Sequence, residues 1–251
     1  MLTKQRKQLI LRKLSQEGQV IAKQVSHELG LSEDTIRRDL RELAEEGLLL
    51  RVHGGALPSS PANVNFAARE QLGSEAKAAI GRAAAAMVQR NQVVILDGGT
   101  TTRELARRLP STLRATVVTH SPTIAMELVD HAQIEVILIG GRLFKHSVVA
   151  VGAAAIEAIS QIRADTFFMG VTGIHPEFGL STGDLEEAHI KRALSAAAAD
   201  TIVLASSEKL NAASPYVIMP VREATGMIVE RAVPREATEV YERMGITVTR
   251  A

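Results

Sequence analysis

The run SEDTIRRDL at positions 32–40 constrains this chain most. A basic, glycine-rich run, RVHGGA, follows it at positions 51–56, and its first residue lies eleven positions after Leu40. Ser32 stands where a helix N-cap is needed, and the two acidic residues after it suit the first turn of a helix. From Ile36, apolar residues recur at i, i+4 and i+7, which predicts one buried side. The sequence therefore predicts a helix with a basic outer face, followed by a tight glycine turn.

Two further helical patterns precede this helix. Arg6, Ile10 and Leu14 are four residues apart and share one face of a first helix. Residues 20–29 predict a second amphipathic helix, ended by Gly30, whose buried stripe consists of Ile21, Val25 and Leu29. A short connection between two amphipathic helices, the second with a basic outer face, is the arrangement that reading of the DNA major groove requires.

These spaced motifs resemble the DeoR family of bacterial transcriptional regulators, whose winged helix-turn-helix carries a TIRRDL recognition helix and an R-x-HGGA wing. The resemblance implies that the first 57 residues form an α+β winged helix-turn-helix domain that binds double-stranded DNA. The residues expected to contact DNA are Ser32, Thr35, Arg37, Arg38, Arg41, Arg51, His53 and Gly54.

A structural explanation of the same residues stays open. Glu33 with Arg37, and Asp34 with Arg38, are i,i+4 pairs of the kind that exposed helices often carry without a function. Residues 1–57 hold ten Lys or Arg against eight Asp or Glu, so their net charge is only +2. The distribution of residues, and not the charge alone, favours DNA binding.

The composition narrows the class of protein. At 251 residues the chain fits two modest domains, and 46% hydrophobic residues suffice for a core. Aromatic residues at 3% argue against single-strand binding by base stacking. The absence of Cys excludes disulfides and thiolate metal sites, and the histidines lack metal-site spacing. We therefore expect no metal or cofactor, no membrane association and a cytoplasmic location, since the charged N-terminus is not a secretory signal.

A composition break, LPSSPAN at positions 57–63, marks the expected domain boundary. Residues 1–57 are expected to form the DNA-binding domain, residues 58–73 a linker, and residues 74–251 an α/β domain that senses an effector and oligomerises. An alanine-rich helix is predicted at the start of that second domain, over positions 74–89.

Short apolar runs then alternate with helical patterns. Strands are predicted at 93–96, 115–118, 134–139, 166–169 and 202–205, with two more at 217–218 and 227–229, and helices at 102–109 and 122–129. This alternation predicts an α/β domain with a largely parallel sheet. In such sheets, ligands bind beyond the carboxyl ends of the strands.

Glycine, threonine and other small polar residues follow four of these strands. Glycines let the backbone approach a ligand, and threonine hydroxyls with free N–H groups at a helix start can hold an anion. The best single candidate is the loop DGGTTT at positions 97–102, although such residues also form ordinary turns. It lacks the lysine of a Walker A loop and is not a G-x-G-x-x-G fingerprint.

The family resemblance extends over nearly the whole chain, because its sensor domain is similar to sugar-phosphate isomerases. It adds the motifs EEA-x-x-K, here at 186–191, and D-x-S-K, here at 206–209 with Ser206 in place of Asp. His120 stands where many members have Asn, which leaves the ligand open. The residues expected to bind a phosphorylated sugar or sugar acid are Asp97, Gly98, Gly99, Thr100, Thr101, Thr102, Thr119, His120, Ser121, Gly140, Gly141, Gly170, Lys191 and Lys209.

Two alternatives accompany this interpretation. Lys191 lies four residues after Glu187, so an intrahelical ion pair is its structural explanation. The rival class is a sugar-phosphate isomerase or deaminase with an accessory DNA-binding domain, since carboxylates and a histidine are available for proton transfer. A recognition helix has no task in such an enzyme, so we expect a regulator, and no enzyme. Paired half-sites on DNA lead us to expect a homodimer or homotetramer.

Overall fold

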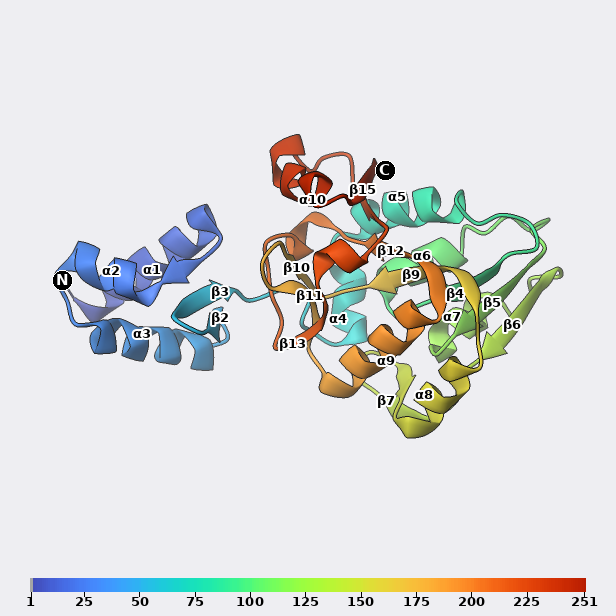
Figure 1. The fold of residues 1–251 in the computed structure, drawn as a ribbon, viewed down its shortest axis with the longest axis horizontal. Coiled ribbons are helices and arrows are strands. Elements are labelled where there is room, and N and C mark those ends of the chain that lie inside the picture. Colours follow the sequence, from blue (N-terminus) through green and yellow to red (C-terminus); the bar gives the residue numbers. More distant parts are fainter. Residues whose placement is uncertain (1) are drawn as a thin grey trace.

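The computed structural model describes residues 2–251 (Figure 1). The N-terminal part is a winged helix-turn-helix in which three helices pack on a small antiparallel sheet of order β1-β3-β2. Its elements are α1 (Thr3–Glu17), β1 (Val20–Ile21), α2 (Ala22–Leu29), α3 (Glu33–Glu45), β2 (Leu49–Val52) and β3 (Gly55–Pro58). Figure 1 shows these elements at one end of the molecule, joined to the remainder through β3.

Local sequence explains most of this part. Gly18 and Gly30 end α1 and α2 in the left-handed conformation. The apolar stripe of α3 is buried as predicted. The three residues spaced four apart on α1, Arg6, Ile10 and Leu14, are buried as well. The prediction for α2 was wrong at its start: β1 pairs with β3, which turns Ile21 outward to 47% exposure while its neighbour Ala22 is buried. Successive strand residues point to opposite sides, so a strand start moves the buried position by one residue.

The remainder of the chain is built on a seven-stranded sheet of order β15-β14-β12-β9-β4-β5-β6, in which every neighbouring pair is parallel. The strands expected from the sequence are confirmed at β4, β5, β6, β9, β12 and β14. The bounds are β4 (Val93–Leu96), β5 (Ala115–Thr119), β6 (Ile134–Leu138), β9 (Ala164–Gly170), β12 (Ala198–Leu204), β14 (Gly226–Val229) and β15 (Thr247–Arg250).

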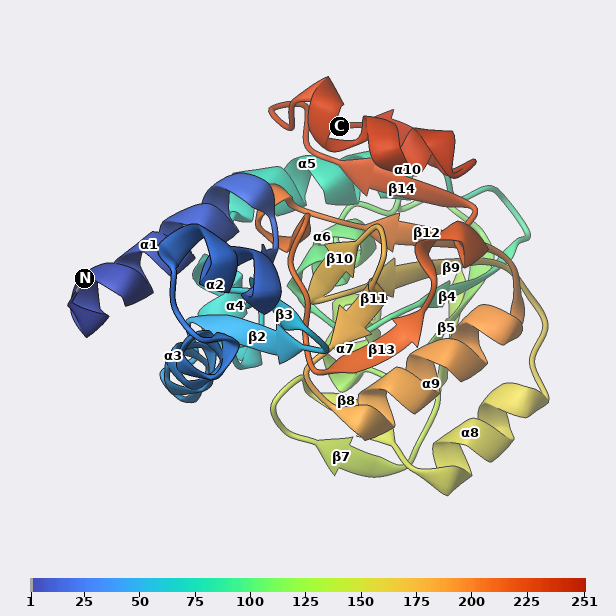
Figure 2. The ribbon, with the colours of Figure 1, turned by 60° about the vertical axis from the view of Figure 1, so that its left-hand side comes forward.

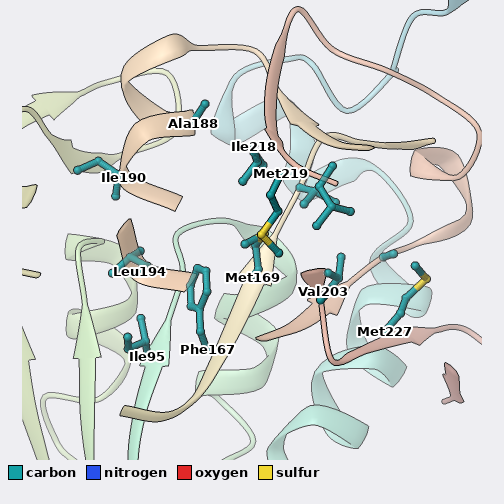
Figure 3. Packing of buried hydrophobic residues seen from close by; sticks show 14 of the residues in the cluster. Ile95, Phe167, Met169, Ala188, Ile190, Leu194, Val203, Ile218, Met219 and Met227 are labelled. Atoms are coloured by element: carbon teal, nitrogen blue, oxygen red, sulfur yellow. The ribbon is translucent and has the colours of Figure 1, made fainter. Parts of the chain in front are cut away.

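Helices cover both faces of this sheet (Figure 2). One face packs on α5 (Ser74–Ala85), α6 (Thr100–Ala106) and α7 (Pro122–Glu127), and the other on α8 (Ala153–Ser160), α9 (Leu185–Ala196) and α10 (Glu239–Arg243). Adjacent strand residues enter opposite cores, as Phe167 and Phe168 do. Figure 3 shows Phe167 among Ile95, Leu194 and Val203 in the α9-side core.

Smaller elements surround the carboxyl edge of the sheet. A second, antiparallel sheet has the order β10-β11-β13, and β7 pairs with β8 as a hairpin. The predicted strand at 217–218 belongs to this second sheet. The bounds are α4 (Phe66–Gln71), β7 (Arg142–Phe144), β8 (Val149–Val151), β10 (Gly173–His175), β11 (Gly179–Thr182), η1 (Ser207–Lys209), β13 (Tyr216–Met219), η2 (Val221–Glu223) and η3 (Arg235–Ala237).

The strand order places a topological switch point between β4 and β9. From β4 the chain runs outward through β5 and β6, and it then returns to β9 and continues through β12, β14 and β15. The carboxyl ends of β4 and β9 therefore diverge into loops on either side of a crevice, which is where open α/β sheets bind ligands. Of residues 2–251, no helix combines the length and apolar character needed to cross a membrane.

Candidate DNA-binding surface and ligand pocket

The start of α3 is fixed by its own side chains. The Thr35 N–H donates to Ser32 Oγ at 3.2 Å, and the two hydroxyl oxygens lie 2.9 Å apart. Both residues are therefore held at the N-terminus of the helix, where Ser32 acts as the N-cap. Substituting such a cap by alanine costs about 1 kcal/mol, so Ser32 has a structural role whether or not it contacts DNA.

The arginines of α3 form its exposed face. The side chains of Arg37 and Arg38 are 55% and 64% exposed, and Arg41 is exposed as well. Arg37 donates to Glu33 Oε1 at 2.7 Å, whereas the Arg38 Nε atom stays 3.9 Å from Glu42. Ion pairs of this exposure contribute ~1 kcal/mol or less, so these guanidinium groups can exchange their partners for DNA at little cost.

The wing lies beside this face. Arg51 and His53 are exposed on β2 and its turn, and Gly54 has a φ of 78° in the left-handed region. At Gly55 a Cβ atom would come within 1.9 Å of the Val20 carbonyl oxygen, so only glycine allows β1 and β3 to approach so closely. One shallow depression is lined by residues of both α3 and the wing, among them Arg37, Arg51, His53 and Gly54.

A buried ion pair holds α1 against α3. The Asp39 carboxylate is fully buried and accepts from Arg6 Nε and from Arg6 Nη2, the latter at 2.9 Å. The hydrogen bond that Arg6 donates to Asp39 raises the pKa of Arg6, in spite of the opposing effect of burial. Asp39 therefore braces the domain, and it points away from the exposed arginine face of the same helix.

A pocket lies at the switch point, above the carboxyl ends of β4 and β9. Eight of the residues expected to bind a ligand belong to its lining: six residues of the strand-end loops and both expected lysines. The whole lining consists of Ala62, Arg69, Leu72, Lys77, Gly98, Gly99, Thr100, Thr101, Thr102, Gly170, Val171, Thr172, Thr182, Glu187, Lys191 and Lys209. The helix predicted from Thr102 begins at Thr100, so all three threonines lie in its first turn.

Four cations from four different elements enter this pocket. Lys77, Lys191 and Lys209 are 3%, 2% and 6% exposed, and Arg69 of α4 is largely buried. Burial, together with the nearby charges of Lys77, Arg69 and Lys191, lowers the pKa of Lys209 to about 8. Burial also lowers the pKa of Lys77 and of Arg69. Buried cations of one sign are costly unless an anion compensates them.

Arg69 has the clearest unmet hydrogen-bonding capacity. Its Nε and Nη2 atoms are buried, and neither has a hydrogen-bond partner within residues 2–251. The guanidinium lies in the pocket lining and also borders the adjoining small cavity with Glu187 and Ser147. A planar guanidinium with two free N–H groups suits an oxyanion such as phosphate or carboxylate.

Asp97 lies beneath the pocket and connects its two sides. Its fully buried carboxylate accepts from the N–H groups of Gly98 and Gly170, both at 2.8 Å. It also accepts from Lys191 Nζ, and its Oδ1 atom lies 2.9 Å from His120 Nε2. Burial alone would raise the pKa of Asp97, but the charge of Lys191 and the hydrogen bond from His120 outweigh it and lower that pKa to about 2. The carboxylate therefore fixes the loop and Lys191 in place.

Glu187 is the second buried carboxylate of this site. It accepts from Ser147 Oγ at 3.2 Å and from Thr182 Oγ1 at 3.1 Å, while Lys191 Nζ lies 3.5 Å away. The intrahelical pair that offered a structural explanation for Lys191 therefore exists, but Asp97 binds the same ammonium group more closely.

The other expected ligand residues lie elsewhere. Thr119, His120 and Ser121 are fully buried below the pocket, where Thr119 Oγ1 donates to the Leu96 carbonyl at 2.7 Å. Gly140 and Gly141 follow β6, on the far side of β5 from the pocket, and are exposed. These five residues and Asp97 do not belong to the pocket lining. Their contact with a ligand stays a prediction.

Sequence reasoning missed Arg69 and Lys77 as site residues. Lys77 lies three residues before Ile80 and seven before Ala84, so it occupies the buried stripe of α5. A lone lysine on an apolar stripe was a usable signal. Arg69 carried none, because only the packing of α4 against the pocket brings it there.

A winged helix-turn-helix followed by an α/β domain with a cation-lined pocket defines the class of two-domain transcriptional regulators. A model of the DeoR-like helix-turn-helix domain matches residues 6–61, and a model of the DeoR C terminal sensor domain matches residues 73–231. The chain belongs to the DeoR family, whose members are regulators and not enzymes.

Curated relatives cover three quarters or more of the chain. The HTH-type transcriptional regulator GlpR of Haloferax volcanii is 34% identical over 99% of this chain and 98% of its own length. The repressor GlcR of Bacillus subtilis is 33% identical over 94% of this chain and 92% of its own length. The glycerol-3-phosphate regulon repressor of Escherichia coli is 35% identical over 76% of each chain. Among solved structures, ribose 5-phosphate isomerase A of Methanocaldococcus jannaschii aligns over 54% of each chain, with 15% identity and a TM-score of 0.40.

Proposed function

We propose that this regulator is a repressor whose affinity for DNA is set by a phosphorylated sugar or sugar acid bound in the switch-point pocket. The observation that carries the proposal is the buried Arg69 guanidinium, whose Nε and Nη2 atoms have no partner among residues 2–251, beside three buried lysines. The carboxylates that act on these cations belong to Asp97, Glu187, Glu208, Glu104 and Glu70. One relative is named a glycerol-3-phosphate regulon repressor, and this name supports a phosphorylated ligand.

Three regions divide the work in this proposal. Residues 1–57 form the reading head, in which the eight DNA-contact residues named above face the duplex from α3 and the wing. Residues 74–251 form the sensor, which also holds a homodimer or homotetramer together so that two heads meet paired half-sites. Residues 58–73, here called the strap, connect the two.

The strap is the proposed link between ligand and DNA, because it closes the pocket. Ala62, Arg69 and Leu72, all from the strap, are part of the pocket lining. The enclosed space of about 30 Å³ admits roughly two water molecules, whereas ligand sites typically measure ~300–1,000 Å³. A sugar phosphate therefore requires the strap to move.

Hydrogen bonds hold the strap against the sensor. Ser59 pairs with Ala213 in a β-bridge, the Ala213 N–H donates to the Pro58 carbonyl at 3.1 Å, and Ser60 Oγ donates to the Thr172 carbonyl. Farther on, the Phe66 N–H donates to the His146 carbonyl at 2.9 Å. Since β3 ends at Pro58 and the bridge begins at Ser59, a displacement of the strap reaches the wing without an intervening flexible segment.

A disulfide across the bridge tests the strap. The chain has no cysteine, so the double variant Ser59→Cys with Ala213→Cys contains a single possible intramolecular crosslink. Bridge partners of this kind have a Cα separation that a disulfide can span. The oxidised variant should bind a duplex selected from a random-sequence library as the wild type does, but it should lose the response to sugar phosphates.

The measurement is fluorescence anisotropy of the labelled duplex, with ribose 5-phosphate, glucosamine 6-phosphate, glycerol 3-phosphate and 6-phosphogluconate as probes. Release of DNA from the wild type, absent in the oxidised variant and restored by reduction, is the expected result. The single variant Ser59→Cys, which cannot form the intramolecular crosslink, is the control. An oxidised variant that responds as the wild type does contradicts the role of the strap.

A further inference from the structure

His120 makes two hydrogen bonds that a neutral imidazole cannot make together. The ring is fully buried, with Nδ1 2.9 Å from the Ala150 carbonyl oxygen and Nε2 2.9 Å from Asp97 Oδ1. A neutral imidazole carries one N–H, so one of its nitrogens only accepts. A carbonyl oxygen also only accepts. One of the two contacts therefore fails unless a second proton is present on the ring or on Asp97.

The carboxylate of Asp97 does not hold that proton. It accepts from the N–H groups of Gly98 and Gly170 and from Lys191 Nζ, and each of these three donors stabilises the ionised form. The charge of Lys191 helps to lower the pKa of Asp97 to about 2 in spite of its burial, so the carboxyl group is ionised near neutral pH. The proton consequently resides on the ring, and both ring nitrogens donate.

We propose that His120 is a buried imidazolium that positions Asp97 and adds a positive charge beneath the pocket, tuning the site for a dianion. This inference rests on the proposed function, in which the pocket binds an anion. The lining holds four cations and the carboxylate of Glu187, and Asp97 lies beneath it. The imidazolium adds one further positive charge to this site, and a phosphate group carries close to two negative charges near neutral pH.

Charged groups from every neighbouring element contribute to the same field. Asp97 faces the ring from the end of β4, and β8 contributes only the backbone carbonyl of Ala150. Behind Asp97 lie Lys191 and Glu187 of α9, and across the pocket lie Arg69, Lys77, Glu208 and Lys209. Replacing the ring by an uncharged side chain removes one positive charge, so the affinity for a dianion should fall. Because burial lowers the pKa of Lys209 to about 8, the comparison is made at one pH below that value.

Inorganic sulfate is the probe, because it remains a dianion throughout the range in which phosphate titrates. Its dissociation constant is measured by calorimetry at pH 7 for the wild type and for His120→Asn, whose side chain is polar but carries no charge. We expect His120→Asn to bind sulfate on the order of a hundredfold more weakly than the wild type, which is the effect of one unit charge on a dianion about 10 Å away at an effective dielectric of ~20.

The control variant is His189→Asn, since His189 is exposed on α9 and its replacement should leave the affinity for sulfate unchanged. A second measurement does not depend on any ligand: ¹⁵N spectra of histidine-labelled wild type should show one imidazolium with both nitrogens protonated at pH 7, and His120→Asn should remove it. A neutral tautomer at His120 overturns the inference. If sulfate binds equally well to wild type and Lys209→Met, the anion pocket itself is wrong, while the spectra still report on the ring.

Discussion

The ion pair between Arg6 and Asp39 gives a sharp test of how the reading head is held together. Asp39 lies in the middle of the TIRRDL helix, where a role in base recognition and a role in packing are both conceivable. The structure assigns it to packing, because it is fully buried and receives both guanidinium hydrogen bonds of Arg6. Asp39→Ala should therefore abolish DNA binding by unfolding the head, and not by removing a contact.

The magnitude follows from the burial of the pair. Removing one partner of a buried ion pair leaves an uncompensated charge and costs about 3–5 kcal/mol. A head of about 57 residues has a total stability of roughly 3–9 kcal/mol at ~0.05–0.15 kcal/mol per residue. Asp39→Ala should consequently leave a large fraction of heads unfolded at 25 °C. Arg6→Met combined with Asp39→Leu removes both charges and should restore most of the stability.

Hydrogen exchange of the full-length protein provides the assay, since peptides from α1 and α3 can be followed apart from the sensor. Asp39→Ala should lose protection in both helices, whereas peptides of the seven-stranded sheet stay protected. Arg38→Ala is the matched control, because it changes a 64% exposed side chain of the same helix. Wild-type protection together with lost DNA binding in Asp39→Ala would refute the brace and place Asp39 at the DNA.

Four further results are expected. Arg38→Ala should lose about 1–3 kcal/mol of specific binding per base contact at fixed salt without a loss of stability, measured by gel shift. Arg51→Ala should weaken all duplexes alike and flatten the salt dependence, and a loss confined to one sequence would contradict a phosphate contact. Thr100→Ala with Thr101→Ala should remove the response to sugar phosphates while DNA binding persists; an unchanged response places the effector elsewhere. The pKa of Lys209 is lowered to about 8, so between pH 8 and its ordinary pKa of ~10.4 the unfolded chain binds more protons than the folded chain does. The thermal stability of the wild type should therefore rise with pH across this range, and Lys209→Met should lack that rise.

Local patterns predicted the reading head well, because its determinants are close in sequence. The Ser32 cap, the stripe of α3 and the Gly54 turn each depend on residues within one or two turns of chain. The start of α2 failed for the opposite reason, since β1 exists only through its pairing with β3 some thirty-five residues later. Ile21 was therefore assigned to the wrong side.

The pocket was predicted only in part, for a topological reason. Strand ends with glycine and threonine are visible in the sequence, but strand order decides which of them adjoin. Because β9 lies next to β4, Gly170 joins the loop at Gly98–Thr102. The ends of β5 and β6 lie on the other side of β4, which separates Gly140 and Gly141 from the pocket.

In the proposed mechanism, His120 and the strap residue Arg69 both act on Asp97, which would connect ligand charge with strap position. Asp97 holds Lys191 and the Gly98 and Gly170 backbone from one side, and it receives His120 from the other. The strap closes the pocket above these groups through Arg69, whose unpartnered N–H groups have no anion to bind among residues 2–251. An incoming phosphate would accept hydrogen bonds from Arg69 and repel the carboxylates of Asp97 and Glu187. Its binding would therefore change the energy of the strap and of the groups beneath the pocket together. A ligand shifts DNA affinity only by its differential affinity for the two strap positions, typically about 1–3 kcal/mol. The Pro58–Ala213 and Ser60–Thr172 hydrogen bonds, at ~1 kcal/mol each, are of the size needed to set that difference.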